Sequence, residues 1–289
     1  MNKVRERLHL FGLPLIVAVL CAVGGGLWYE SNKAESPRSL HVAFLNIGQG
    51  DSIYIESPTG TQVLVDGGPD SSLLRELTSV MDPFDRTLDA IIVTNPDQDH
   101  FAGFIPLLGR YSVGEELEPG TVKTTLTYKA LVSALTENKV PRILAKRGMI
   151  LDLGGGAVLQ VLYPDRDVSH LAPNDGSVVM KLIYGKTSVM LMGDATAKVE
   201  EHLISLGTTT LPADILKLGH HGSKTSSSES WLEVVHPSEA IVSAGCKNKY
   251  GHPSKEVTDR LASDLIPYLW TCKEGTIAFT SDGVVWTRQ

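Results

Sequence analysis

The sequence of 289 residues predicts a mixed α/β domain in which two β-sheets pack face to face between outer helices, an αββα sandwich. Two observations favour this fold class. Apolar, strand-like runs cluster toward both ends of the region from about residue 40 to residue 289, and helical patterns punctuate them. Their order does not follow the strict strand–helix alternation that one parallel sheet requires.

The strands are expected where apolar residues alternate with polar ones or form short continuous runs. These patterns occur at 41–47, 52–56, 62–66, 89–93, 158–163, 177–184, 187–192, 214–218, 239–243, 275–280 and 283–287. Apolar residues at helical spacing, with Asp or Ser near several starts, predict helices at 71–81, 100–109, 127–138, 196–206, 228–235 and 254–264.

The N-terminal region carries an apolar run from about residue 8 to residue 28, preceded by basic residues at positions 3, 5 and 7. About 20 apolar residues span a bilayer, so we expect residues 1–29 to form an uncleaved signal anchor, a single transmembrane helix. Basic residues on the short side keep the N-terminus cytoplasmic, which would place the body of the protein outside the cytoplasmic membrane. A cleaved signal and a secreted protein remain the alternative. Residues 30–39 form a polar linker, and residues 40–289 a single domain.

Charge and cysteine content give weaker information. The chain has 26 basic and 33 acidic residues, so no global basic field announces a nucleic-acid binder. A local patch or bound metal ions can supply positive charge instead. Cys246 and Cys272 could form one bridge, but their spacing matches no disulfide framework and no zinc ribbon. We therefore expect two unpaired, buried thiols.

The loop Thr94–His100 is the densest group of potential metal ligands. It follows an apolar run, Ala90–Val93, that is typical of a buried strand, and it precedes a predicted helix. Its candidate ligands are Asn95, Asp97, Asp99 and His100. The carboxyl end of a strand is where open α/β sheets usually bind ligands.

Further acidic residues stand at other predicted strand ends. Asp51 and Asp66 lie in glycine-rich turns, where they would either cap the turn or hold the imidazoles of metal ligands. Asp194 follows an apolar strand, where it would either cap the next helix or bridge two cations with its two oxygens.

Two histidine-containing segments complete the pattern. His220 and His221 follow a predicted strand, and one of them would bind metal while its neighbour meets substrate. The sequence does not say which. The loop at 243–254 contains Lys249, Tyr250 and His252, which either cradle a phosphodiester or belong to a solvated loop.

Together these segments resemble, in order and spacing, the metallo-β-lactamase-like domain at the C-terminal end of ComEC-type DNA-internalisation proteins. The matching segments are GQGDS at 48–52, LVDGG at 64–68, TNPDQDH at 94–100, NDGSVV at 174–179, GDA at 193–195, LKLGHHGS at 216–223 and NKYGHP at 248–253. The resemblance covers roughly residues 40–287. The family's HxHxDH loop has a variant form, HPDxDH, and in the NPDQDH of this chain Asn95 stands in place of its first His.

The resemblance implies the metallo-β-lactamase sandwich and a metal-dependent hydrolase of phosphodiesters, a nuclease acting on single- or double-stranded DNA. Activity outside the cytoplasmic membrane would serve DNA uptake and competence. With one apolar span where the relatives have a polytopic channel, we expect a stand-alone, membrane-anchored domain that works with a separate membrane DNA-channel protein.

The resemblance also implies roles for individual residues. One divalent metal would be held by Asp99, His100, Asp194 and one of His220 or His221. A second would be held by Asn95, Asp97, Asp194 and Asn174. Catalytic roles fall to Asp99 and His252, substrate contacts to Lys249, Tyr250, His252 and Ser223, and support of the ligands to Asp51 and Asp66.

The substitution at Asn95 affects which metal is expected. An asparagine offers a neutral carbonyl oxygen, which is a weaker zinc ligand than an imidazole. The second pocket would therefore be rich in oxygen, which suits Mn²⁺ or Mg²⁺ better than Zn²⁺. One firmly bound and one weakly bound divalent ion are the expectation. Two alternatives stay open: a hydrolase of the same fold for a β-lactam, lactone or phosphocholine ester, and a binding domain with weakened catalysis.

Overall fold

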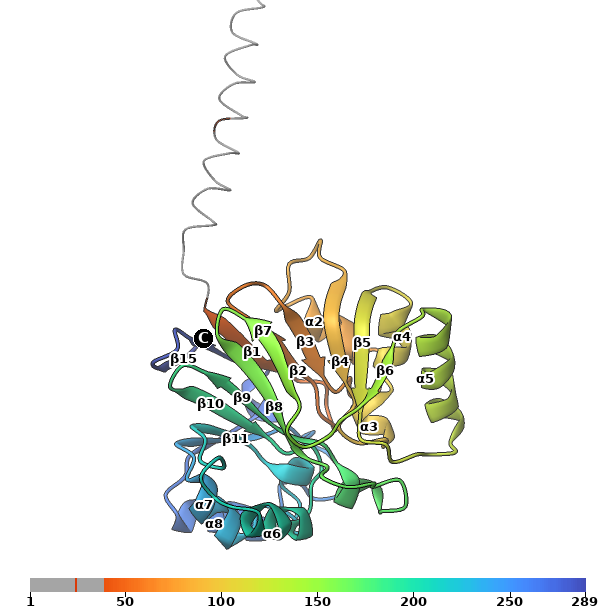
Figure 1. The fold of residues 1–289 in the computed structure, drawn as a ribbon. Coiled ribbons are helices and arrows are strands. Elements are labelled where there is room, and N and C mark those ends of the chain that lie inside the picture. The colour runs from red at the N-terminus through yellow and green to blue at the C-terminus, as the bar shows by residue number, and fades with distance from the viewer. Residues whose placement is uncertain (1–23, 25–38) are drawn as a thin grey trace, which may run out of the picture. The chain divides into compact units, whose positions relative to one another are not determined.

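The computed structural model describes Gly24 and residues 39–289, so the predicted anchor, apart from Gly24, and nearly all of the predicted linker lie outside the described residues (Figure 1). Within the described part of the chain, every helix is too short or too polar to cross a bilayer.

Two sheets form the centre of the domain (Figure 1). The first sheet comprises, in spatial order, β15 (Trp286–Arg288), β14 (Ile277–Ser281), β1 (Leu40–Phe44), β2 (Ile53–Glu56), β3 (Gln62–Val65), β4 (Thr87–Ile92), β5 (Ser112–Glu118) and β6 (Arg142–Leu144). The second comprises β13 (Tyr268–Trp270), β12 (Glu239–Val242), β11 (Ile215–Lys217), β10 (Thr187–Leu191), β9 (Val179–Tyr184), β8 (Ala157–Tyr163) and β7 (Ile150–Gly154).

The helices lie outside the sheets. The outer face of the first sheet packs against α2 (Ser72–Leu77), α3 (Gln98–Phe101), α4 (Phe104–Leu108) and α5 (Leu126–Glu137). The outer face of the second sheet packs against α6 (Ala197–Ser205), α7 (Glu229–Val235) and α8 (Lys255–Ser263). The short elements α9 (Thr271–Glu274), η1 (Pro173–Gly176) and η2 (Gly219–Gly222) belong to connections.

Three apolar clusters follow from this layering. One lies between the sheets and includes Phe44 and Phe279, whose rings meet edge to face. One lies under α2 to α5 and includes Phe101 and Phe104. The third lies under α6 to α8 around the fully buried Trp231. Because each sheet is buried on both faces, its strands are nearly continuous in apolar residues. The predicted αββα sandwich is confirmed.

Most helix boundaries agree with the expectation because their caps are legible in the sequence. The hydroxyls of Thr125, Ser228 and Ser254 accept hydrogen bonds from the first turns of α5, α7 and α8. The predicted helix at 100–109 is wrong as a single element, because it is interrupted at Gly103. A Cβ atom there would collide with the carbonyl oxygen of Gly67, so the chain needs glycine for this close approach.

The expected strands omitted β5, β6, β7 and β13. β5 carries Glu116 and Glu118, which obscure its apolar pattern; Glu118 pairs with Arg142 of β6 at 2.6 Å. β6 and β13 contain three residues each, too few for a period to show. The strand expected at 283–287 begins only at residue 286, because the Asp282 carboxylate caps a turn at Val284 and Val285.

Because of the strand directions, the connections that follow six of the strands lie at the same edge of the sandwich. In the first sheet β3 to β6 are parallel to one another, and β1 has the same direction. In the second sheet β10 to β13 are parallel, and β8 shares their direction. The segments after β1, β3, β4, β10, β11 and β12 carry nearly all the residues singled out as candidate ligands.

Candidate metal centre

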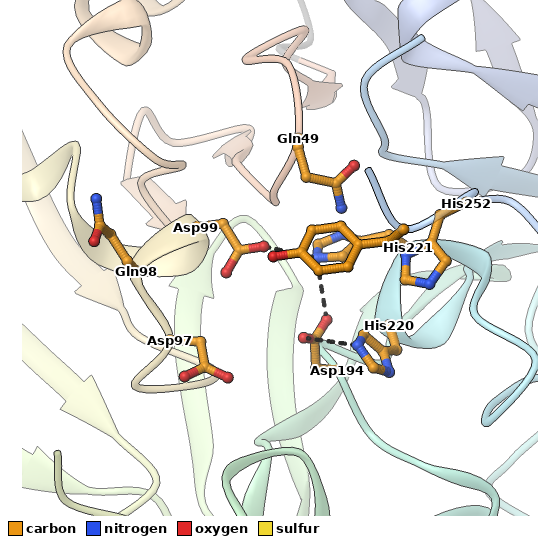
Figure 2. A pocket seen from close by; sticks show the side chains of 9 residues that line it. Gln49, Asp97, Gln98, Asp99, Asp194, His220, His221 and His252 are labelled. Atoms are coloured by element: carbon orange, nitrogen blue, oxygen red, sulfur yellow. Dashed lines mark ion pairs between the residues drawn. The ribbon is translucent and has the colours of Figure 1, made fainter. Parts of the chain in front are cut away.

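A cavity of about 330 Å³ opens at this edge. Figure 2 shows its walls, which come from both halves of the fold. They are formed by Gln49, Asp97, Gln98, Asp99, Asp194, His220, His221, Tyr250 and His252. Every residue of the lining has a polar side chain, which is unusual for a pocket that binds an apolar molecule.

Asp194 lies at the centre of the cluster, between two imidazoles. Its Oδ2 is 3.2 Å from His100 Nε2, and its Oδ1 is 3.4 Å from His221 Nε2. The two rings stack at a centroid distance of 5.3 Å. Asp99 joins this cluster through its Oδ2, 3.5 Å from His221 Nε2. The cluster thus contains Asp99, His100, Asp194 and His221.

Each imidazole is oriented by a second carboxylate. His100 Nδ1 lies 2.8 Å from Asp66 Oδ2, and His221 Nδ1 lies 3.1 Å from Asp51 Oδ1. His221 Nδ1 also faces the Ser243 carbonyl oxygen at 3.0 Å. Both partners accept hydrogen bonds, so the Nδ1 atom carries a proton and Nε2 is the ring atom left to face Asp194. This is the arrangement in which histidines ligate metals.

The cluster fits a cation because its inward atoms have no hydrogen-bond partner. His100 Nε2, His221 Nε2 and Asp194 Oδ1 are all buried and unpaired. Such orphaned atoms are costly without a proton or a cation between them. Ligand atoms of Asp99, His100 and His221 lie within 4.8 Å of one another. Asp51 and Asp66 fall in similar groups, but their oxygens are already engaged by the Nδ1 atoms, so we assign them to orientation.

The electrostatics point the same way. Burial would lower the pKa of the His221 imidazole, but the carboxylates of Asp194 and Asp51 outweigh it and raise that pKa to about 10. For His100 burial is again outweighed, by Asp194 and Asp66, and its pKa rises well above the usual value. Burial by itself would raise the pKa of Asp194, but the two imidazoles have the larger effect, and the pKa of this carboxyl falls below its usual value. The cluster therefore attracts positive charge, which a metal ion would supply in exchange for protons.

Lys217 was not singled out from the sequence. It ends β11 fully buried, and its Nζ lies 2.6 Å from Asp51 Oδ2. This ion pair and the His221 contact lower the pKa of Asp51 to about 2, against the opposing effect of burial. The signal available in the sequence was a lone charge inside an apolar strand.

The backbone at η2 adopts an unusual conformation. His220 and His221 both have positive φ, 48° and 57°, which costs a non-glycine residue on the order of 1 kcal/mol each. The turn sends the two side chains in different directions. His221 points into the cluster, while His220 lies at the rim with its Nε2 3.9 Å from Asp194 Oδ2.

The four residues expected to hold a second metal are not assembled. The Asn95 side chain is buried; its Oδ1 accepts from the Asp97 backbone N–H at 2.9 Å, and its Nδ2 donates to Asn174 Oδ1 at 2.8 Å. The backbone donor fixes which amide atom is oxygen. Neither asparagine lines the cavity. Asp97 does, but its Oδ1 pairs with Lys123 Nζ at 2.5 Å.

Two of the four expected substrate residues face the cavity. Tyr250 and His252 line it, with their rings stacked at 5.6 Å. Burial and the neighbouring imidazoles lower the pKa of His252 to about 4. Lys249 instead lies over the outer face of the Tyr250 ring, and Ser223 is buried against Thr225 outside the lining.

Gln49 is a cavity residue that the sequence did not reveal. Its Oε1 accepts from the Gly245 backbone N–H at 3.3 Å, so its Nε2 is turned away as a donor. That Nε2 is buried and has no partner. The sequence signal that could have identified Gln49 as a cavity residue is its position between two glycines.

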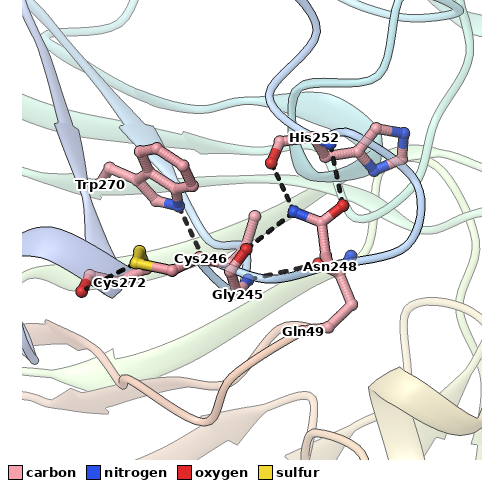
Figure 3. The surroundings of a disulfide bond; sticks show 8 residues. Gln49, Gly245, Cys246, Asn248, His252, Trp270 and Cys272 are labelled. Carbon is pink, nitrogen blue, oxygen red and sulfur yellow. Dashed lines mark hydrogen bonds between the residues drawn. A yellow bond between two sulfur atoms is a disulfide. The ribbon is translucent and has the colours of Figure 1, made fainter.

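The expectation of two unpaired, buried thiols is wrong. Cys246 and Cys272 form a disulfide with a Cα–Cα distance of 5.3 Å, and the Cys246 side chain is exposed (Figure 3). The strands that precede them, β12 and β13, are neighbours in the second sheet, which the sequence spacing of 26 residues could not show. The bond anchors the loop that carries Tyr250 and His252.

Side chains around the disulfide hold this loop in shape (Figure 3). Asn248 Nδ2 donates to the carbonyl oxygens of Gly245 and His252 at 2.7 and 2.6 Å, and its Oδ1 accepts from the His252 N–H at 2.9 Å. Trp270 Nε1 donates to the Ala244 carbonyl oxygen. The aromatic wall of the cavity is thus fixed from behind.

Fold and cluster together define a domain of the metal-binding hydrolase type. The chain belongs to the metallo-beta-lactamase superfamily, whose family model matches residues 45–245. Among solved structures it resembles Zn²⁺-bound PqqB from Methylobacterium extorquens, with a TM-score of 0.52 and 12% identity over 82% of this chain and 99% of that one. A likeness at that identity shows the fold alone.

Two curated relatives are named as Com proteins. The chain is 31% identical to ComE operon protein 3 of Bacillus subtilis over 82% of its own length and 32% of the relative. It is 27% identical to competence protein ComA of Neisseria gonorrhoeae over 92% of its own length and 38% of that relative. The chain therefore spans about a third of the length of these relatives and is homologous to one part of them.

Proposed function

We propose that this domain is a metal-dependent phosphodiesterase that cleaves DNA during its uptake. The observation that carries the proposal is the convergence of unpaired His100 Nε2, His221 Nε2 and Asp194 Oδ1 atoms in a polar cavity. The competence relatives support DNA as the substrate. A phosphodiester also fits a lining made of polar side chains.

Asp99, His100, Asp194 and His221 would hold the first divalent ion. The chemistry that such an ion supplies is polarisation of a phosphoryl oxygen and a lowered pKa of water. The donor set mixes imidazole with carboxylate, which Zn²⁺ and Mn²⁺ both accept. Asp97 and His220 are cavity residues that could ligate a second ion in place of Asn95 and Asn174, which bind each other.

The chain's own residues perform the positioning. Asp66 and Asp51 keep the Nδ1 protons of the two imidazoles and so aim both Nε2 atoms inward. On the facing wall, Gln49 Nε2 is a neutral donor for a non-bridging phosphate oxygen. Tyr250 and His252 lie where a leaving oxygen or a flanking sugar would contact the wall.

We also propose that the domain works outside the cytoplasmic membrane, behind the N-terminal anchor. An exposed disulfide supports this location, because such bonds persist in oxidising compartments and are rare in the cytosol. A separate membrane channel would then be its partner.

The test of the activity uses the purified chain with single- and double-stranded DNA and Mn²⁺, Mg²⁺ or Zn²⁺. We expect cleavage, and we expect Asp194→Ala to reduce both cleavage and measured metal affinity by at least about 100-fold. Asp264→Ala, which removes an exposed carboxylate at the end of α8, is the matched control. Hydrolysis of a chromogenic β-lactam without any DNA cleavage would overturn the proposal.

A further inference from the structure

A second and larger cavity opens at the same edge of the fold as the metal centre. Its volume is about 1000 Å³, three times that of the metal cavity. The walls come from the segments that follow β5, β6 and β8, at residues 119–120, 144–148 and 165–169. β5 and β6 run parallel to β4, which carries Asp99 and His100 at its carboxyl end. We call this cavity the flanking groove.

A short chain segment connects the two cavities. Gly120 lines the flanking groove, and Lys123, three residues later, pairs with Asp97 in the lining of the metal cavity. Three residues span at most about 10 Å. A polymer cut in the metal cavity therefore reaches the flanking groove within a few units of the cut.

The groove presents positive charge that the protein leaves unpaired. Lys146 and Arg147 are exposed, and within residues 39–289 their side chains make neither ion pair nor hydrogen bond. The groove's lining holds three cations against two carboxylates: Asp165 pairs with Arg166 and His202, while Asp167 accepts from the Ser169 backbone N–H and keeps its negative charge, which leaves the lining net positive. In a chain of net charge −7, free cations at this edge favour an anionic ligand.

The rest of the groove suits the bases of a single strand. Leu144 is 50% exposed at its wall, and Pro119 and Val168 are buried beneath it. Sites for unpaired nucleotides combine a cationic groove, which binds the phosphates, with surfaces against which the bases pack, most often aromatic rings. In this groove the aliphatic Leu144 offers that surface. A duplex hides its bases and offers nothing to that wall.

We propose that the flanking groove is a binding site for single-stranded nucleic acid adjoining the cut site, with Lys146 and Arg147 on its phosphates and Leu144 against a base. The proposal rests on the phosphodiesterase function proposed above. It assigns the groove to affinity for long substrates and not to the cleavage step.

The experiment compares the full chain with the double variant Lys146→Glu/Arg147→Glu. Arg110→Glu/Lys129→Glu is the matched control, since both residues are exposed and lie with α4 and α5 on the outer face of the first sheet. The substrates are bis(4-nitrophenyl) phosphate, which occupies the metal cavity alone, and an oligothymidylate of about 20 nucleotides. Binding of the fluorescent oligonucleotide to metal-free protein is followed by anisotropy at several salt concentrations.

We expect the groove variant to raise Kd and KM for the oligonucleotide at least about 10-fold, with kcat and hydrolysis of the small diester kept within about 2-fold. The slope of log K against log salt should fall in magnitude by about 1.4, for two lost contacts to a single strand. Unchanged binding relative to the control, or equal loss of binding for a duplex of the same sequence, overturns the groove assignment.

The two proposals fail in different ways. A wild-type chain that cleaves neither the small diester nor DNA refutes the phosphodiesterase, whereas a chain that cleaves both while the groove variant binds normally refutes only the groove. If the glutamate variant loses its cooperative thermal transition, Lys146→Gln/Arg147→Gln replaces it. That variant should show a smaller rise in Kd in the same direction, and normal binding by it overturns the groove.

Discussion

Lys217 and Asp51 form a buried ion pair behind His221, which we propose as a metal ligand. The pair lies in the interior, where the attraction between the two charges offsets the cost of removing both from water. Asp51 divides its oxygens between Lys217 and the His221 ring, so the lysine helps to keep that ring in place even though it never reaches the cavity.

Removing the lysine charge should therefore destabilise the fold. We expect Lys217→Met to lower the free energy of unfolding by about 3–5 kcal/mol, because it leaves the Asp51 carboxylate buried beside His221 alone. The double variant Asp51→Asn/Lys217→Met should regain part of that loss. Urea denaturation followed by circular dichroism measures both.

Lys129→Met, on the exposed side of α5, is the control and should change stability by less than about 0.5 kcal/mol. A loss of under about 1 kcal/mol for Lys217→Met would contradict the assigned role of the ion pair.

Which single residues could be predicted depended on where their partners lie. Asp99, His100, Asp194 and His221 each follow a strand, so their convergence could be expected from the rule for strand ends. The Lys217–Asp51 contact joins residues 166 positions apart, and the Asn95–Asn174 contact joins residues 79 positions apart. No local pattern encodes such partners, and the loss of Asn95 from the ligand set follows from one of them.

Among the elements, the loop after β12 depends most on a covalent bond. Cys246 lies at its start, and Tyr250 and His252 lie beyond the bend that Asn248 organises. A bond that closes a loop of this length stabilises by about 3 kcal/mol through the unfolded state.

The Cys246→Ser/Cys272→Ser variant should therefore lose about 3 kcal/mol in urea unfolding, and reductant should bring the wild-type chain to the same value. Amide exchange at residues 247–252 should become faster. Cys21 is the third cysteine of the chain. Protein trapped directly from cells in acid and alkylated should thus carry one free thiol, and three after reduction.

Three free thiols in the trapped protein would exclude both the bond and the proposed oxidising compartment. As a control, reductant should leave the stability of the double variant unchanged. That result would show that the effect of reductant on the wild-type chain comes from this bond.

Element prediction followed side-chain pattern where that pattern was strong. The helices whose first turns are capped by the hydroxyls of Thr125, Ser228 and Ser254 were predicted within a residue or two, whereas α2 ends four residues before its predicted end at 81. β5 was missed because its position between two parallel strands is set by backbone pairing and not by its side chains. The two cysteines were expected to stay apart because the adjacency of β12 and β13 is a property of the sheet.

At the scale of the whole molecule, stability should depend on the pH through Glu116. Burial and the nearby Glu118 raise the pKa of this carboxyl to about 7, although Arg142 opposes the shift. The native state then binds more protons than the unfolded chain between about pH 4.5 and 7, so stability falls as the pH rises through that window and levels off above it.

Glu116→Gln removes this penalty. Relative to wild type, the variant should gain up to about 3 kcal/mol as the pH rises from about 4.5 to 7, and the gain should then stay constant. Thermal and urea unfolding across that range provide the measurement, with the exposed Glu137→Gln as control. A gain that does not change with pH would show that Glu116 is ionised in both states.

The layer order could be predicted from the sequence, because helices separated two groups of strands. The order of strands within each sheet could not. β1 lies beside β14, near the other end of the sequence, and β3 lies beside β4 only after an intervening helix. Which strands become neighbours depends on which faces of the sheets must be buried. That is determined only when the whole core assembles.

The direction of β1 has a consequence for access. Leu40 begins that strand, and the strand ends toward the loop of Gln49 and Asp51, so the chain joins the sandwich at the rim opposite the cavity. The mouth of the cavity is therefore approached from the rim opposite Leu40, where loops from both sheets surround it.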